Sequence, residues 1–138
     1  MDEFQRQEVH LWMIKSQRDL EAAHVLFESQ ASLLDIVVYH CQQSAEKALK
    51  AYLTYRCVLF PKTHDLETLL DLCLPFASGF VRLQDMAEDL TPYATMFRYP
   101  GSVIAPASQE AKEAIEKADY FFNFVLSVLP DGILCDEK

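Results

Sequence analysis

The 138-residue sequence lacks the features that mark several broad protein classes. It has no uncharged run approaching the roughly 20 apolar residues that a membrane-spanning helix needs. Its four cysteines, Cys41, Cys57, Cys73 and Cys135, include no closely spaced pair of the kind that binds a metal ion. Its first residues are acidic and do not form a basic segment leading into an apolar core, as a secretory signal would. These absences predict a cytoplasmic protein with reduced thiols and no membrane contact.

The sequence also lacks the common motifs for metal and cofactor binding. His10, His24, His40 and His64 stand at no zinc-binding spacing, and no His-Glu-x-x-His pattern occurs. No glycine-rich phosphate loop is present either. We therefore predict that the protein binds no metal ion and no cofactor.

A basic excess, typical of dedicated nucleic-acid binders, is missing as well. The chain has 12 Lys and Arg residues against 21 Asp and Glu residues, which gives a net charge of -9. This balance disfavours DNA as a partner. Exposed charges are screened over about 8 Å at physiological salt, so a local basic groove remains compatible with a nucleotide or a short RNA.

Apolar residues do recur at three- and four-residue steps along most of the chain, as in amphipathic helices. We expect one domain over residues 1–138, with a core over 9–129 and a tail over 130–138. The pattern, together with the absence of strand-like alternation, predicts an all-α, antiparallel up-and-down bundle of four long helices and one shorter one. The expected helices cover about 9–28, 36–57, 64–74, 82–98 and 108–129, with a loop over 98–107.

Short polar residues and prolines set the expected helix ends. Thr63, Thr91 and Ser108 are placed to cap the third helix, the second part of the fourth helix and the last helix. Pro92 suits a first helical position, and Thr91-Pro92 is expected to reset the fourth helix without ending it.

The second helix has the clearest division into two faces. Gln43, Glu46, Lys47 and Lys50 are expected to face solvent, where Glu46 and Lys50 can pair four residues apart. The opposite face is an apolar stripe, which we expect to be buried: Val38, Cys41, Ala45, Ala48, Leu49, Tyr52 and Leu53.

Three segments of the chain together resemble a known family. The second helix contains Gln42-Gln43 followed by the run from Ala45 to Ala51 that reads Ala-Glu-Lys-Ala-Leu-Lys-Ala, and Arg98-Tyr99-Pro100 comes later. With Ser16-Gln17-Arg18-Asp19-Leu20 in the first helix, these segments are similar to HEPN domains, which are nucleotide-binding or RNase helical bundles. The resemblance covers roughly residues 11–129. It implies a homodimer that partners a minimal nucleotidyltransferase, often as half of a toxin-antitoxin pair.

Arg98 is the main candidate for ligand binding. A planar guanidinium at the end of a helix can bind phosphate through two parallel donors, although a salt bridge to a carboxylate is an equal alternative on residue chemistry alone. The resemblance favours the ligand role, because the corresponding arginine of the family lies at the ligand groove. We therefore predict a nucleotide- or RNA-phosphate-binding site formed by the following residues: Arg98, Tyr99, Lys47, Lys50 and Gln43.

The sequence departs from the RNase branch of the family at one position. That branch has a histidine separated from the arginine by four to six intervening residues, where this chain has Val103, Ile104 and Ala105. Loss of a positioned acid-base group lowers a rate by typically 100- to 10,000-fold. We hypothesise a binding and interaction module, and leave open an endoribonuclease in which His64 replaces the missing base, or a purely structural dimer.

Overall fold

In the computed structural model, which describes residues 1–30, 32–101 and 103–135, the chain is entirely helical. The described residues contain no strand, which confirms the predicted all-α class. One position of the expected 98–107 loop and the last three residues of the expected tail lie outside the described residues. The helices are α1 (Glu3–Glu28), α2 (Leu34–Tyr55), α3 (Leu66–Cys73), α4 (Gln84–Leu90) and α5 (Ser108–Ser127), with 3-10 helices η1 (Ser78–Leu83) and η2 (Thr91–Ala94) on either side of α4.

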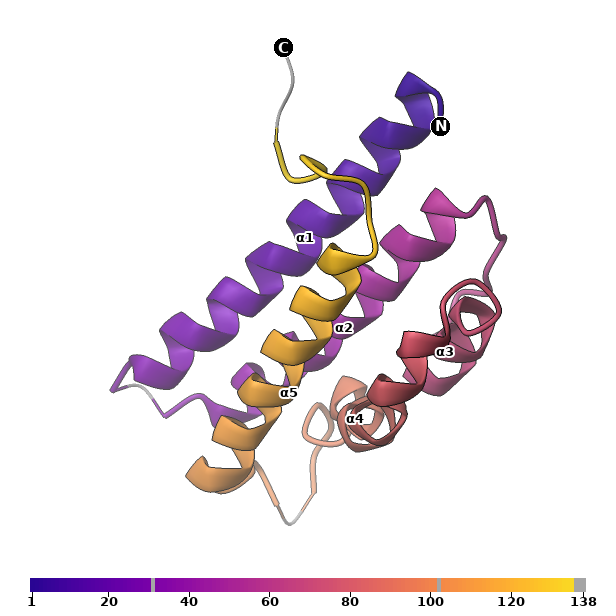
Figure 1. Ribbon diagram of the computed structural model, residues 1–138. Coiled ribbons are helices and arrows are strands. Elements are labelled where there is room, and N and C mark those ends of the chain that lie inside the picture. The colour runs from indigo at the N-terminus through magenta and orange to yellow at the C-terminus, as the bar shows by residue number, and fades with distance from the viewer. Residues whose placement is uncertain (31, 102, 136–138) are drawn as a thin grey trace.

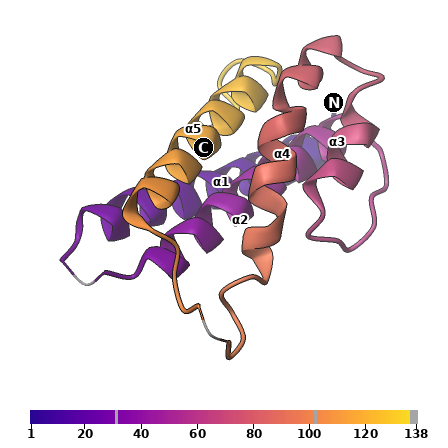
Figure 2. The same ribbon diagram turned by 90° about the horizontal axis from the view of Figure 1, so that it is seen from below.

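Three long helices form the main layer of the bundle. Figure 1 shows α1 and α2 running side by side in opposite directions, with α5 packed along them. The short helices α3 and α4 lie on the other side of α2, and Figure 2 shows α4 crossing the bundle beside α5. Helix α2 is therefore the central element, and it packs against every other α-helix. Within the described residues, no helix is both long enough and apolar enough to cross a membrane.

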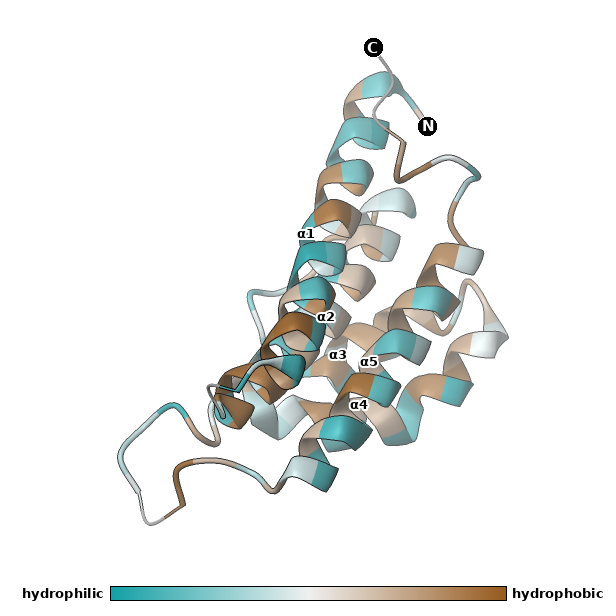
Figure 3. Cartoon of the chain, turned by 90° about the vertical axis from the view of Figure 1, so that its left-hand side faces the viewer, coloured by the Kyte–Doolittle hydropathy of each residue, from teal (hydrophilic) through white to brown (hydrophobic). Residues whose placement is uncertain are grey.

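Helix α1 begins six residues earlier than expected, because its cap lies at the start of the chain. The Asp2 carboxylate accepts a hydrogen bond from the Gln5 amide at 2.7 Å, which satisfies a donor that has no partner within the helix. Hydrophilic and hydrophobic residues alternate along α1 (Figure 3), as expected of a helix with one buried face. Ser16, Leu20 and Ala23 lie on the buried face.

The apolar stripe of α2 is buried throughout, as predicted. The prediction that the other face of α2 is exposed was wrong, because Gln43 and Glu46 are buried too. The reason is tertiary. The segment before α3 and the second half of α1 cover the polar side of α2, and they bond to its side chains.

The fourth predicted helix is broken into short pieces. Pro92 lacks an amide hydrogen, and the chain around it tightens into η2 and then into turns up to Arg98. Helix α4 therefore has 7 residues, and α3, which ends at Cys73, has 8. Within the described residues the bundle has three long helices and two short ones in place of four and one.

The expected caps of the later helices were wrong in detail. Asp65, not Thr63, caps α3 by accepting a hydrogen bond from the Glu67 amide. Thr91 does not act as the expected N-cap and is instead the C-cap of α4. Its hydroxyl donates to the Ala87 carbonyl and accepts from the Leu66 amide, which ties α4 to α3. Ser108 is the first residue of α5 and makes no capping bond.

Packing continues beyond residue 129, where the core was expected to end. Ile133 is only 2% exposed, and its carbonyl accepts a 2.7 Å hydrogen bond from Nδ1 of His10 on α1. The segment after α5 thus folds back over the N-terminal helix (Figure 1).

Candidate functional site

Arg98 lies on the surface, at the end of the turns that follow η2. Its Cζ atom is 4.1 Å from the centre of the Tyr39 ring on α2, a cation–π contact. Its backbone amide donates to the Thr95 carbonyl at 3.0 Å, which closes the turn. Among the described residues, no carboxylate forms an ion pair with the guanidinium. The Tyr39 ring covers one face of the guanidinium. The N–H groups along the edges of the guanidinium remain available to an anion.

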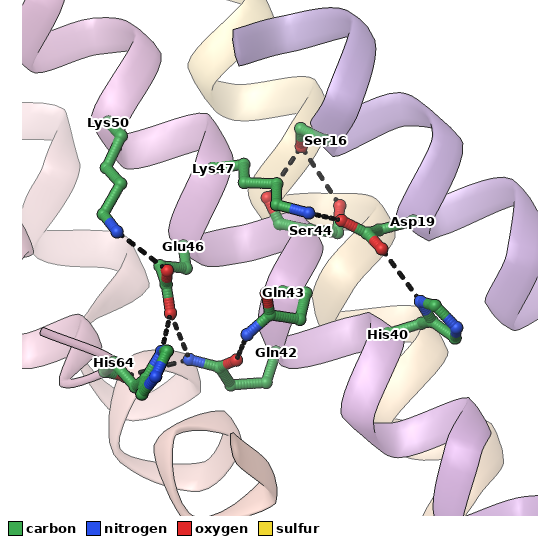
Figure 4. Close-up of polar contacts among 10 residues, drawn as sticks. All are labelled: Ser16, Asp19, His40, Gln42, Gln43, Ser44, Glu46, Lys47, Lys50 and His64. Atoms are coloured by element: carbon green, nitrogen blue, oxygen red, sulfur yellow. Dashed lines mark hydrogen bonds and ion pairs between the residues drawn. The ribbon is translucent and has the colours of Figure 1, made fainter.

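Beside Tyr39 lies a carboxylate-centred group that we call the Asp19 cluster, formed by Asp19, His40 and Lys47. Asp19 on α1 binds Nδ1 of His40 at 2.8 Å through one oxygen and Nζ of Lys47 at 2.6 Å through the other (Figure 4). The rings of Tyr39 and His40 meet edge to face, with centres 5.7 Å apart. The Asp19 cluster therefore adjoins the ring on which Arg98 packs.

The acid of this cluster is ionised at neutral pH. Burial alone would raise the pKa of Asp19, but hydrogen bonds from His40 and Lys47 outweigh burial and hold that pKa below its usual value. Two small residues bring α1 and α2 close enough for these contacts. Ser16 on α1 is buried, and its hydroxyl donates to the Ser44 carbonyl of α2 at 2.7 Å.

A second group, which we call the Glu46 cluster, consists of Glu46, His64, Lys50, Gln42 and Gln43. One Glu46 oxygen binds Nδ1 of His64 at 2.8 Å and the other binds Nζ of Lys50 at 2.8 Å. Gln42 donates to Glu46 and to the His64 carbonyl, and Gln43 donates to Gln42 (Figure 4). The cluster fastens the segment before α3 to the side of α2.

Burial would raise the pKa of Glu46, but hydrogen bonds from Lys50, His64 and Gln42 outweigh it, and the net pKa is lowered. Lys50 is almost buried, with 11% of its side chain exposed, and its ammonium lies over the rings of Trp12 and Phe60. An ion so placed is stabilised chiefly by its carboxylate partner.

The residues predicted to bind a ligand separate into three places. Arg98 and Tyr99 are at the surface, and Tyr99 is 72% exposed. Lys47 belongs to the Asp19 cluster, whereas Lys50 and Gln43 belong to the Glu46 cluster. The Glu46–Lys50 pair was expected on a solvated face, and the pairing is confirmed but lies inside the bundle.

His64 was predicted to replace a missing base if the fold brought it beside Arg98. Its side chain is 65% exposed, but Nδ1 is bound to Glu46, and no contact within residues 1–30, 32–101 and 103–135 joins it to Arg98. Val103 and Ile104, which stand where the RNase branch has its histidine, are exposed apolar residues.

Sequence reasoning missed His40 and Asp19. Asp19 entered only as part of the first-helix segment that resembles the family, and His40 was set aside for lack of a zinc-binding spacing. His40 and Lys47 are seven residues apart, two turns along one side of α2, and could have been paired with an acid on the neighbouring helix. The sequence does not reveal the register between α1 and α2, which decides which residues of the two helices face each other.

Tyr93 and two of the four cysteines are occupied or buried, whereas Cys57 and Cys135 are exposed free thiols. The Tyr93 hydroxyl donates to Glu110 on α5 at 2.5 Å, and burial together with that acid raises the pKa of Tyr93. Burial raises the pKa of the Cys41 and Cys73 thiols to about 12, so neither is a ready nucleophile. No group of three or more His, Cys, Asp or Glu side chains in the described part of the chain is placed to hold a metal ion.

Comparisons with known proteins agree with this architecture. Residues 9–128 match the family model of the HEPN domain. The fold is similar to the crystal structure of an archaeal HEPN homologue, with a TM-score of 0.67 and 24% sequence identity over 86% of this chain and 95% of the other. No protein with curated annotation matches the chain.

Proposed function

Because this chain belongs to the HEPN domain family, we propose that it is a nucleotide- or RNA-phosphate-binding module in which Arg98 contacts the phosphate. The observation that carries the proposal is the exposed guanidinium packed on the Tyr39 ring, with no acid bound to it among the described residues. An arginine neutralised by a protein carboxylate would have little to offer an anion. A guanidinium oriented by an aromatic face keeps its paired donors for phosphate oxygens.

In this proposal the other predicted residues have different tasks. Tyr99, next to Arg98 and largely exposed, is the second direct contact and offers a ring for base stacking. Lys47, Lys50 and Gln43 act by fixing α2, because their polar atoms are already bonded within the protomer. The net charge of -9 favours a short ligand over a long polyanion.

We further propose that the protein works as a homodimer and as the partner of a minimal nucleotidyltransferase in a toxin-antitoxin-like pair. Membership of the family supports this role, and the exposed apolar side chains Val103 and Ile104 beside the Arg98 turn supply surface for a protein contact. Light scattering would give the oligomeric state. Co-purification with a nucleotidyltransferase encoded next to this chain would test the partnership. A monomeric protein that does not bind such a nucleotidyltransferase would contradict both the dimer and the partnership.

The binding role is tested by titrating ATP, GTP and a short RNA with wild-type protein and with Arg98→Ala. Hydrogen bonds to a charged group contribute about 1.5–3 kcal/mol each, so we expect Arg98→Ala to weaken binding about tenfold or more. Arg82→Ala is the matched control, since Arg82 is an exposed arginine on η1. Affinity should be unchanged in that variant.

Two outcomes would contradict the proposal. If no ligand binds saturably and Arg98→Ala only lowers the melting temperature, the protein is a structural dimer. If the protein cleaves RNA in the presence of a chelator and Arg98→Ala abolishes cleavage, it is a metal-independent endoribonuclease and not a module that only binds.

A further inference from the structure

The Tyr39 ring has two neighbours that can carry positive charge, Arg98 and His40. The Arg98 guanidinium lies 4.1 Å from the ring centre, and the His40 ring centre lies 5.7 Å from it. Arg98 comes from the turn after η2, whereas Tyr39 and His40 come from the first half of α2. The fold thus brings a histidine and the proposed phosphate-binding arginine into contact with the same aromatic ring.

The Asp19 cluster fixes which nitrogen of His40 is free. Asp19 is ionised and can only accept hydrogen bonds, so Nδ1 of His40 must carry the proton that it shares with Asp19. Lys47 binds the other Asp19 oxygen, which keeps the carboxylate from rotating. Nε2 is therefore the nitrogen that changes with pH: it accepts when the ring is neutral and donates when the ring is charged.

From this geometry we propose that His40, in its protonated form, donates through Nε2 a second hydrogen bond to the phosphodiester that Arg98 contacts. This inference rests on the proposed function and adds to it a residue and a condition. The ionisable groups around His40 are Asp19, which binds its Nδ1, Lys47 on the other Asp19 oxygen, and Tyr39, whose ring also contacts Arg98. A bound phosphate adds a negative charge, which favours the charged form of a neighbouring imidazole.

A short RNA without terminal phosphates is the appropriate probe, because each phosphodiester keeps one negative charge between pH 5.5 and 8.5. A change in affinity over that range then reports on the protein. At constant salt we expect wild-type protein to bind the RNA about tenfold more tightly at pH 5.5 than at pH 8.5, as one charge-assisted hydrogen bond is gained. Any general effect of protein charge is common to all variants.

Two substitutions separate the roles of the two ring nitrogens. The amide of His40→Asn keeps a donor to Asp19 but has nothing at the position of Nε2, so the fold should persist and the tenfold pH effect should disappear. His40→Gln places a neutral donor near Nε2, and its affinity should be intermediate and independent of pH. His24→Gln is the matched control, because His24 binds Asp119 at 2.8 Å on another part of the surface. It should behave as wild type.

The outcomes distinguish this inference from the proposed function. Binding that depends on Arg98 but is insensitive to pH, or a His40→Asn variant with the wild-type profile, would overturn the role of His40 alone. Cleavage of the RNA that increases with pH would also overturn it, because the working form of Nε2 would then be the neutral one. Absence of any Arg98-dependent binding at either pH would overturn both.

Discussion

The Asp19 cluster and the Glu46 cluster use the same three kinds of side chain in different surroundings. In each, one carboxylate binds a lysine through one oxygen and a histidine Nδ1 through the other. Asp19 joins α1 to α2 and holds a histidine beside Tyr39 and the exposed Arg98. Glu46 joins α2 to the segment before α3 and holds an almost buried lysine.

The two clusters differ in their surroundings and not in their composition, and on that ground we propose that one serves mainly stability and the other ligand binding. The lysine of the Glu46 cluster has little access to solvent, so the ion pair of this cluster mainly affects the stability of the fold. The Asp19 cluster lies nearer the surface, and 25% of the Lys47 side chain is exposed. Its carboxylate can position His40 without being the main support of the bundle.

The largest expected effect is on stability when Glu46 is replaced. Glu46→Gln leaves the charge of Lys50 in a nearly buried place without a counter-ion, and loss of one partner of a buried pair typically costs about 3–5 kcal/mol. Urea unfolding gives this value. The exposed Glu113→Gln on α5 is the control and should change little. A loss below about 1 kcal/mol for Glu46→Gln would erase the distinction between the clusters.

A smaller loss is expected from Asp19→Asn. Lys47 can turn toward water when its partner is neutral, so we expect about 1–3 kcal/mol, the usual range for an unsatisfied hydrogen-bonding group. The same variant should weaken the pH dependence of RNA binding, whereas Glu46→Gln should leave it intact. If Asp19→Asn destabilises as much as Glu46→Gln, or if both alter RNA binding equally, the two clusters are not divided as we infer.

Acid should destabilise the protein through both carboxylates. Hydrogen bonds hold their folded-state pKa values below those of the unfolded chain, so the unfolded chain takes up protons first as pH falls. Stability should be fully present above about pH 5 and decline as the pH falls through the ordinary carboxyl range near 4 toward the lower folded-state values. Urea titrations from pH 7 to pH 3 would measure the decline. Each of Asp19→Asn and Glu46→Gln should make it shallower, and an unchanged slope in both would contradict the assignment.

The smallest effect is expected at a solvent-exposed ion pair outside both clusters. Lys117 on α5 binds Asp89 on α4 at 3.0 Å. Exposed pairs of this kind are worth about 0.2–1 kcal/mol, so Lys117→Ala should lower the unfolding free energy by less than 1 kcal/mol. Added salt should reduce that difference further. If Lys117→Ala lowers the unfolding free energy as much as Asp19→Asn does, burial does not determine how much each ion pair contributes to stability.

Much of the fold could be read from local sequence. The apolar positions of α5 were predicted and are buried, because a three- and four-residue period places them on one side whatever the neighbours are. The α2 stripe was predicted for the same reason. The polar side of α2 was not, since periodicity identifies the more apolar face but does not say whether another segment covers the remaining one.

The candidate site was only partly predictable. Arg98 was identified from its place after a helix and from the Arg-Tyr-Pro segment, and its exposure agrees with the role proposed for it. Its platform, Tyr39, is 59 positions earlier in the chain, and His40 depends on an acid from a third segment. Such contacts follow from helix register, which no local pattern encodes.

The sequence by itself determined the helical class, the apolar faces of α1, α2 and α5 and the presence of a candidate arginine, because each depends on residue type and on the spacing of near neighbours. Only the tertiary structure decided that Lys47 and Lys50 bind different carboxylates, that the polar face of α2 is enclosed, and that Arg98 and His40 both contact the ring of Tyr39. Those facts depend on the relative positions of separate helices, which are set by packing of the whole bundle.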